Sequence, residues 1–215
     1  MSYLKKGDYW PLTEEDRKRV KRYKENKKLF KGVHDEVFKN IQLKLDNKDQ
    51  IAMTYLVANY CGLLSKISAD MLFGEQPSLK FENKAVEKRM EDLIKDNNLY
   101  TTLYESALGN SYRGDACYKV RYAKKSSYSD ERCIIIEPQN PNYYFVEQAD
   151  DNIRQIDRQI IGWDFLLDDI GDGIDDTHYL KLEVHEPGYI YNFLYKLHGA
   201  LVQVEVGLIR LYRTL

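Results

Sequence analysis

The spacing of apolar side chains along the chain predicts helices first and strands afterwards. Thr13 and the three acidic residues behind it predict a helix start, because a hydroxyl caps free amides and acids suit the positive end of the helix dipole. A strongly basic helix is expected to reach about Phe30, with so few apolar positions that it lies on a surface. Residues 32–48 fit either a helix or a strand, since their apolar positions follow both spacings.

The strongest helical pattern covers residues 49–73, where apolar side chains recur at intervals of three and four. Its first half is apolar almost all round, which predicts a central core helix. Gly74 is placed to end this helix in a left-handed C-cap, and Pro77 prevents the helix from resuming. A short strand is expected next, at residues 78–82.

A helical pair and a long hairpin are predicted in the middle of the chain. Asn83 starts a helix that Asn97 and Asn98 break, and a second helix runs over residues 99–112. The Arg-Gly-Asp tripeptide at 113–115 is interpreted as the turn from this helix into a strand. Strands at 116–123 and 132–137, joined by the polar loop 124–131, then form the hairpin.

The rest of the chain, after this hairpin, is predicted to form antiparallel β structure. The predicted fold class is therefore α+β. Extended segments are expected at 142–146, 153–165, 179–185 and 189–195 or beyond, with a turn at Glu186-Pro187-Gly188. Helices followed by strands argue against a wound parallel sheet. We expect an N-terminal basic helical segment at 1–48 and one α+β domain at 49–215.

Charge is nearly balanced overall but unevenly distributed. The net charge is -2, yet bases dominate residues 5–31 and acids dominate residues 147–176. One interpretation is two solvated faces of opposite sign. The other is head-to-tail complementarity between neighbouring subunits, which would place interface charges at Lys21, Arg22, Lys24, Asp168 and Asp169. The 18 tyrosines, beside 7 phenylalanines, suit half-buried strands and wet subunit interfaces.

No catalytic, metal or cofactor motif emerges from the residues. The Asp-rich stretch 168–176 lacks the ligand spacing of a calcium loop and is interpreted as a solvated loop. A weaker alternative is a metal-dependent nuclease that uses its carboxylates (Asp168, Asp169, Asp172, Asp175, Asp176). The four histidines lack metal-ligand spacing, and three scattered cysteines indicate reduced thiols. We expect no enzyme activity, no cofactor, no signal peptide and no membrane span.

Four segments resemble SPP1-type phage portal proteins, in the same order along the chain. They are residues 67–77, ending in Phe-Gly followed by Pro; residues 104–112 with 116–120; residues 136–140; and residues 179–190. The motif positions that carry the resemblance are Phe73, Gly74, Pro77, Pro138, Glu183 and Gly188. Such proteins usually have a Gly where this chain has Ser111 or Tyr112.

The resemblance implies a structural subunit rather than an enzyme. Portal proteins of this kind form rings, usually dodecameric, that assemble in the host cytoplasm and occupy one capsid vertex of the virion. DNA is packaged and ejected through the ring, which works with terminase, capsid and scaffold proteins, and head–tail connector proteins. The matched region would be the outer wing domain.

The length departs from the resemblance, because portal chains of this group are roughly twice as long. We therefore expect a truncated portal chain, lacking the stem, clip and crown. The alternatives are a stand-alone interaction module of portal descent or a non-functional prophage remnant.

Overall fold

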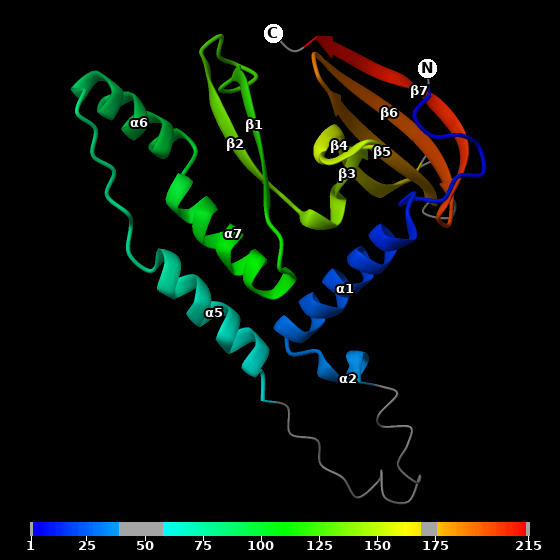
Figure 1. Ribbon diagram of the computed structural model, residues 1–215, viewed down its shortest axis with the longest axis horizontal. Helices are drawn as coiled ribbons and strands as arrows, with labels where there is room; N and C mark the ends of the chain where they lie inside the picture. The colour runs from blue at the N-terminus through cyan, green and yellow to red at the C-terminus, as the bar shows by residue number, and fades with distance from the viewer. Residues whose placement is uncertain (1, 39–57, 169–175, 214–215) are drawn as a thin grey trace, which may run out of the picture. The chain divides into compact units, whose positions relative to one another are not determined.

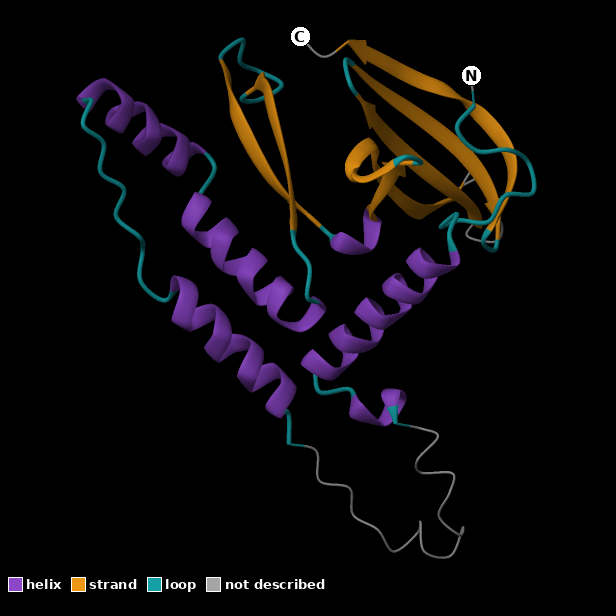
Figure 2. Cartoon of the chain, in the orientation of Figure 1, coloured by secondary structure: helices purple, strands orange, loops and turns teal. Residues whose placement is uncertain are grey.

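The computed structural model describes residues 2–38, 58–168 and 176–213, and it has the predicted α+β fold. The chain divides into two compact units. Unit 1 comprises Met1–Val20 and Asn140–Leu215, and unit 2 comprises Lys21–Gln139. Figure 1 follows the chain through both units, and Figure 2 separates its helices from its strands. The predicted domain boundary at residue 48 lies outside the described residues.

The described helices are α1 (Glu14–Phe30), α2 (His34–Val37), α5 (Tyr60–Phe73), α6 (Lys84–Asp96) and α7 (Leu99–Arg113). Capping side chains fix the starts of α1, α5 and α6. The Asp16 amide donates to the Thr13 hydroxyl (3.1 Å) and the Ala85 amide to the Asn83 side chain (2.9 Å). Gly114, at φ +93°, ends α7 in the left-handed conformation that favours glycine. The predictions for α1, α6, α7 and the turn at 113–115 are therefore confirmed.

The strands form two antiparallel sheets. In unit 1, the order is β3 (Tyr144–Ala149), β4 (Asn152–Asp168), β5 (Asp176–Glu186), β6 (Tyr189–His198) and β7 (Leu201–Arg213). A 3-10 turn, η1 (Pro141–Tyr143), precedes β3. In unit 2, β1 (Cys117–Lys124) pairs with β2 (Arg132–Gln139) to form a two-stranded ribbon. These hairpins confirm the predicted antiparallel pattern, including the turn between β5 and β6.

Unit 1 has a continuous hydrophobic core on its five-stranded sheet. Its buried members come from the N-terminal segment and from β3 to β7: Leu4, Phe145, Ile160, Leu180, Leu182, Val184, Phe193, Tyr195, Leu197 and Val202. The central strands β4, β5 and β6 supply seven of the ten, as expected for alternate residues facing one side of an antiparallel sheet.

The N-terminal segment is fastened to this sheet by backbone hydrogen bonds. Gly7 N donates to Val202 O (2.9 Å), and Val202 N donates to Asp8 O (2.9 Å). The amides of Tyr3 and Leu4 both donate to the buried Tyr195 hydroxyl, at 3.1 Å each. The segment thus lies against the start of β7, where Tyr9 and Leu201 form a single bridge, and supplies partners to a buried hydroxyl that requires them.

Unit 2 is built on the packing of α5 along α7. The buried residues of α5 are Gly62, Ser65 and Ala69, which share one helix face. A Cβ atom at Gly62 would lie 2.8 Å from the Phe30 carbonyl oxygen, so the close approach of α5 to the end of α1 requires glycine there. Small side chains therefore form the packed face of α5.

Three expectations for the segment around α5 are wrong. The described part of the predicted core helix is mostly exposed, because its packed face is made of small residues. Gly74 has φ -64°, so α5 ends in right-handed geometry with Gly74 N donating to Asp70 O (2.7 Å). Residues 78–82 form no strand, since no other strand pairs with them in the described structure. Of residues 32–48, for which the sequence allowed a helix or a strand, His34–Val37 form the short helix α2. Residues 39–48 of that segment and the start of the helix at 49–57 lie outside the described residues.

Candidate subunit-contact surfaces

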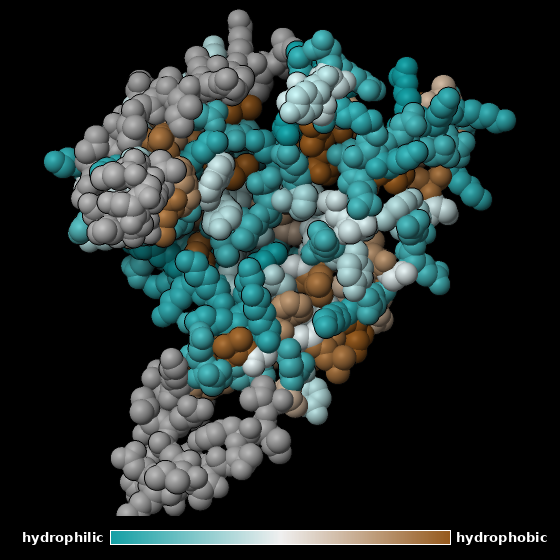
Figure 3. Space-filling view, turned by 180° about the vertical axis from the view of Figure 1, so that it is seen from behind, coloured by the Kyte–Doolittle hydropathy of each residue, from teal (hydrophilic) through white to brown (hydrophobic). Residues whose placement is uncertain are grey.

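Helix α5 turns its large apolar side chains outward. Tyr60, Leu64, Ile67 and Met71 recur at helical spacing, and Leu63 lies beside them; we call these five residues the outer row of α5. Their exposed fractions run from 44% at Ile67 to 84% at Met71. Figure 3 shows apolar side chains gathered over the helices of unit 2. A continuous apolar row of this kind marks an interaction site more often than a chance exposure.

Polar contacts at both ends hold α5 in this orientation. The Asn59 side chain accepts from Gly62 N (2.9 Å) and donates to the Phe30 carbonyl (3.0 Å), which joins the start of α5 to the end of α1. Near the other end, the Tyr104 hydroxyl of α7 donates to the Asp70 carboxylate (2.7 Å). This hydrogen bond raises the pKa of Tyr104 above its ordinary value. The outer row is consequently fixed facing away from α7.

The β1–β2 ribbon exposes a second apolar face. Tyr118, Val120 and Tyr122 pair across the strands with Pro138, Ile136 and Ile134, so the six side chains share one side; we call them the ribbon face. Val120 is 63% and Tyr122 67% exposed. The opposite side carries Lys119 and Arg121, and Arg121 pairs with Glu137 (2.7 Å). The apolar side of the ribbon is thus the uncovered one.

Asn97, between α6 and α7, binds the outer edge of β2. Its side-chain amide donates to the Ile134 carbonyl (2.9 Å) and accepts from the Ile136 amide (2.7 Å). These are the two bonds that another strand would make, so Asn97 closes an edge that would otherwise offer free backbone groups. Lys125, after β1, also pairs with Asp96 at the end of α6 (2.7 Å), which raises the pKa of Lys125.

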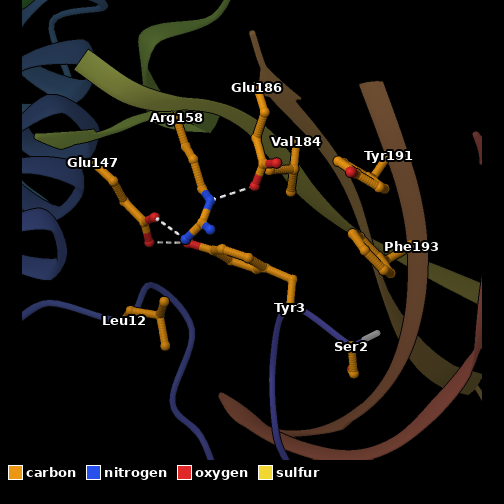
Figure 4. A pocket seen from close by; sticks show the side chains of 9 residues that line it. All are labelled: Ser2, Tyr3, Leu12, Glu147, Arg158, Val184, Glu186, Tyr191 and Phe193. Carbon is orange, nitrogen blue, oxygen red and sulfur yellow. Dashed lines mark hydrogen bonds and ion pairs between the residues drawn. The ribbon is translucent and has the colours of Figure 1, made fainter. Parts of the chain in front are cut away.

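Unit 1 contains a pocket of about 380 Å³ with a charged cluster on one side. Figure 4 shows Tyr3, Glu147, Arg158 and Glu186 converging there. The Arg158 guanidinium donates to Glu186 (2.5 Å) and to Glu147 (3.1 Å), and the Tyr3 hydroxyl donates to Glu147. Aromatic and aliphatic side chains complete the lining: Leu12, Val184, Tyr191 and Phe193.

The cluster in this pocket acts as a clasp for the N-terminal segment. Burial, together with the hydrogen bond to Glu147, raises the pKa of Tyr3 far above its ordinary value, so its hydroxyl stays protonated. The hydrogen bonds to Glu186 and Glu147 raise the pKa of Arg158. Each of the two carboxylates thus accepts hydrogen bonds from within the cluster.

The six motif positions of the resemblance occupy turns and strands in both units. Phe73 and Gly74 end α5, and the Pro77 carbonyl accepts from the Tyr100 hydroxyl (3.0 Å). Pro138 lies within β2, on the ribbon face. Glu183 in β5 pairs with His185 (2.8 Å), and Gly188 turns β5 into β6 at φ +85°. Their part in portal function stays a prediction.

The predicted interface charges are only partly described. Lys21, Arg22 and Lys24 lie exposed on α1. Asp168 ends β4, and Asp169 lies outside the described residues with the rest of the loop to 175. The proposed contact between these charges in neighbouring copies stays a prediction. The sequence interpretation missed the outer row, the ribbon face and the Tyr3 clasp, although the period-two pattern in 117–124 already separated the ribbon's two sides.

Neither a metal site nor a membrane helix is found where the chain is described. Among residues 2–38, 58–168 and 176–213, no group of three or more His, Cys, Asp or Glu side chains is placed to hold a metal ion. The helices in those ranges are all too short or too polar to cross a bilayer. The carboxylates of the loop 169–175 are not among the residues tested.

A comparison with protein families finds a match that begins before α1 and ends within β4. The model of the family described as phage portal protein, SPP1 Gp6-like, matches residues 11–157, more than half of the 215-residue chain. No curated protein matches the chain. The match covers α1, both surfaces of unit 2, β3 and the first six residues of β4.

Proteins of this class are structural and assemble into oligomers with phage capsid and packaging components. The chain belongs to the SPP1 Gp6-like family of phage portal proteins. Three of the four resembling segments lie within the match, and the resemblance of residues 179–190 stays a prediction.

Proposed function

We propose that the chain is a structural subunit of a phage or prophage portal ring, through which DNA is packaged into and ejected from the capsid. The ring assembles in the host cytoplasm and then occupies a capsid vertex, where it works with terminase, scaffold and connector proteins. Family membership supports the portal role. The observation that carries the subunit role is the outer row of α5, because five large apolar side chains at helical spacing require a partner to leave water.

Native mass by light scattering, over a range of protein concentration and salt, tests this proposal. We expect a discrete large oligomer, since a ring closes at a fixed number of copies. A monomer at every concentration would contradict a ring built by this chain. In that case, binding of the chain to intact portal subunits would favour the alternative of an interaction module.

The uneven charge supports a second, weaker contact between copies. We propose that Lys21, Arg22 and Lys24 on α1 meet the acidic segment 150–176 of a neighbour. Changing all three to Glu should weaken assembly most at low salt, where screening is small. The matched control changes the exposed Lys84, Lys88 and Arg89 of α6 to Glu, which gives the same change in net charge. Equal loss in both variants would point to net charge alone.

A further inference from the structure

Unit 2 carries two apolar surfaces that differ in architecture. One is the outer row of α5, a single helical stripe, and the other is the ribbon face, a patch of two paired strands. Both are exposed within the unit to which they belong, with Met71 at 84% and Val120 at 63%. Neither is needed for the packing of α5 on α7, which uses the small residues of α5.

The two surfaces match in length. From Tyr60 to Met71, eleven helical steps of about 1.5 Å give roughly 16 Å. From Tyr118 to Tyr122, four strand steps of about 3.4 Å give roughly 14 Å. The two strands of the ribbon lie about 4.8 Å apart, which makes a platform wide enough for one helix stripe.

The symmetry of a ring requires two different surfaces on each copy. A surface that meets itself gives a closed pair, whereas contact between different patches continues from copy to copy and closes into a ring. We propose that the outer row of α5 in one copy packs on the ribbon face of the next copy. This inference rests on the proposed function and adds the elements that meet.

The side chains suit this pairing. The ribbon face presents two tyrosines, Tyr118 and Tyr122. Their rings contribute a large contact area, and their hydroxyls can stay hydrated at the solvent-accessible rim of an interface. The outer row presents Leu64, Ile67 and Met71, and the flexible thioether of Met71 adapts to an aromatic surface. Asn97 holds the ribbon edge closed, so the contact uses the face of the ribbon and leaves the β2 edge occupied.

A mixing experiment with two charged variants tests the pairing. The Met71→Glu copy has an altered α5 row and an intact ribbon face, and the Val120→Glu copy has the reverse, so the two altered surfaces would repel each other. Each variant alone should bind itself about tenfold or more weakly than the unaltered chain, because a charge would be buried in the contact. Mixed, the two should form a 1:1 heterodimer that grows no further, since one intact contact remains.

The controls make each outcome decisive. Tyr128→Glu changes a fully exposed side chain at the hairpin loop and should assemble like the unaltered chain. Circular dichroism establishes that both variants fold. If either variant alone still assembles normally, or if the two monomeric variants fail to pair, the contact proposed here is wrong. Assembly of the unaltered chain in the same experiment shows that the ring-subunit proposal still stands, whereas failure of the unaltered chain to assemble contradicts both.

Photo-crosslinking locates the contact without a charge change. A benzophenone side chain at Val120 should crosslink to the peptide that contains Leu64 and Met71. Assemblies mixed from isotopically heavy and light chains show whether the linked peptides come from different copies. Crosslinks to another ribbon face, to unit 1 or within the same copy would each overturn the inference.

Discussion

Unit 1 and unit 2 differ in how many of their large apolar side chains they bury. Every member of the main buried cluster belongs to unit 1. In unit 2, the buried residues of the described ranges are Tyr23 and four small ones: Gly62, Ser65, Ala69 and Gly109. Of the twenty-two exposed large hydrophobic residues in the described part of the chain, fourteen lie in unit 2. Unit 1 thus buries most of its core within one chain, whereas the described part of unit 2 leaves most of its large apolar side chains half-buried or exposed.

Replacing one leucine in each unit should give the largest difference between the two units in the free energy of unfolding. Leu182→Ala, at a fully buried site of unit 1, should lower the free energy of unfolding by about 2–5 kcal/mol because it leaves a cavity. Leu64→Ala, at a 63% exposed site of unit 2, should change it by less than about 0.5 kcal/mol. Urea unfolding of dilute protein measures both.

Two optical signals separate the units in that experiment. Trp10 and Trp163, the two tryptophans of the chain, both lie in unit 1, so tryptophan fluorescence follows its sheet. Far-ultraviolet circular dichroism follows the helices α5, α6 and α7 of unit 2. A large loss of stability in dilute Leu64→Ala would show that α5 completes its burial within one copy.

Removing the Asn97 side chain should have an intermediate effect on stability, confined to unit 2. Asn97→Ala removes both bonds to the β2 edge and should destabilise the ribbon by about 1–3 kcal/mol, because two backbone groups lose their partners. Hydrogen exchange at the Ile136 amide measures this directly. Asn97→Asp keeps the acceptor for that amide but loses the donor to Ile134, so it should preserve most of the protection. Equal exchange in both variants would argue against the edge-closing role.

Removing the Tyr3 hydroxyl should have a smaller effect than removing the Asn97 side chain, and the effect should depend on pH. Tyr3→Phe should cost about 1 kcal/mol near neutral pH, since Glu147 keeps its bond to Arg158. The pKa of Tyr3 is raised from 10.0, so its contribution is fully present below pH 10 and is lost as the pH rises through the raised pKa. Urea unfolding of unit 1 at pH 7 to 11 should show the gap between the two proteins narrowing above pH 10. A constant gap would contradict the raised pKa.

Local patterns predicted most elements, because their causes are local. Thr13, Asn83 and Gly114 mark helix ends through capping and backbone conformation, and each element begins or ends beside them as expected. The alternation in β1 and the turn before β6 likewise depend on neighbouring residues.

The errors concern properties that depend on distant residues. The apolar pattern around α5 predicted a core helix, but periodicity does not reveal whether the large or the small face meets α7. The charged clasp joins Tyr3, Glu147, Arg158 and Glu186 from three distant segments, so no local motif contains it. The ends of the β1–β2 ribbon can be predicted from neighbouring residues. The hydrogen bond between the Asn97 side chain and β2 cannot, because the two come together only when unit 2 folds.

The fastening of Tyr3 and Leu4 to Tyr195 has a consequence for synthesis of the chain. The partners are 192 and 191 residues apart, so Tyr3 and Leu4 leave the ribosome first and must wait until Tyr195 has been made. At roughly 5–20 residues per second, the wait is on the order of 10–40 s. Unit 2 emerges entirely within that interval, and its exposed apolar surfaces are available to chaperones and to neighbouring nascent chains before the sheet of unit 1 is complete.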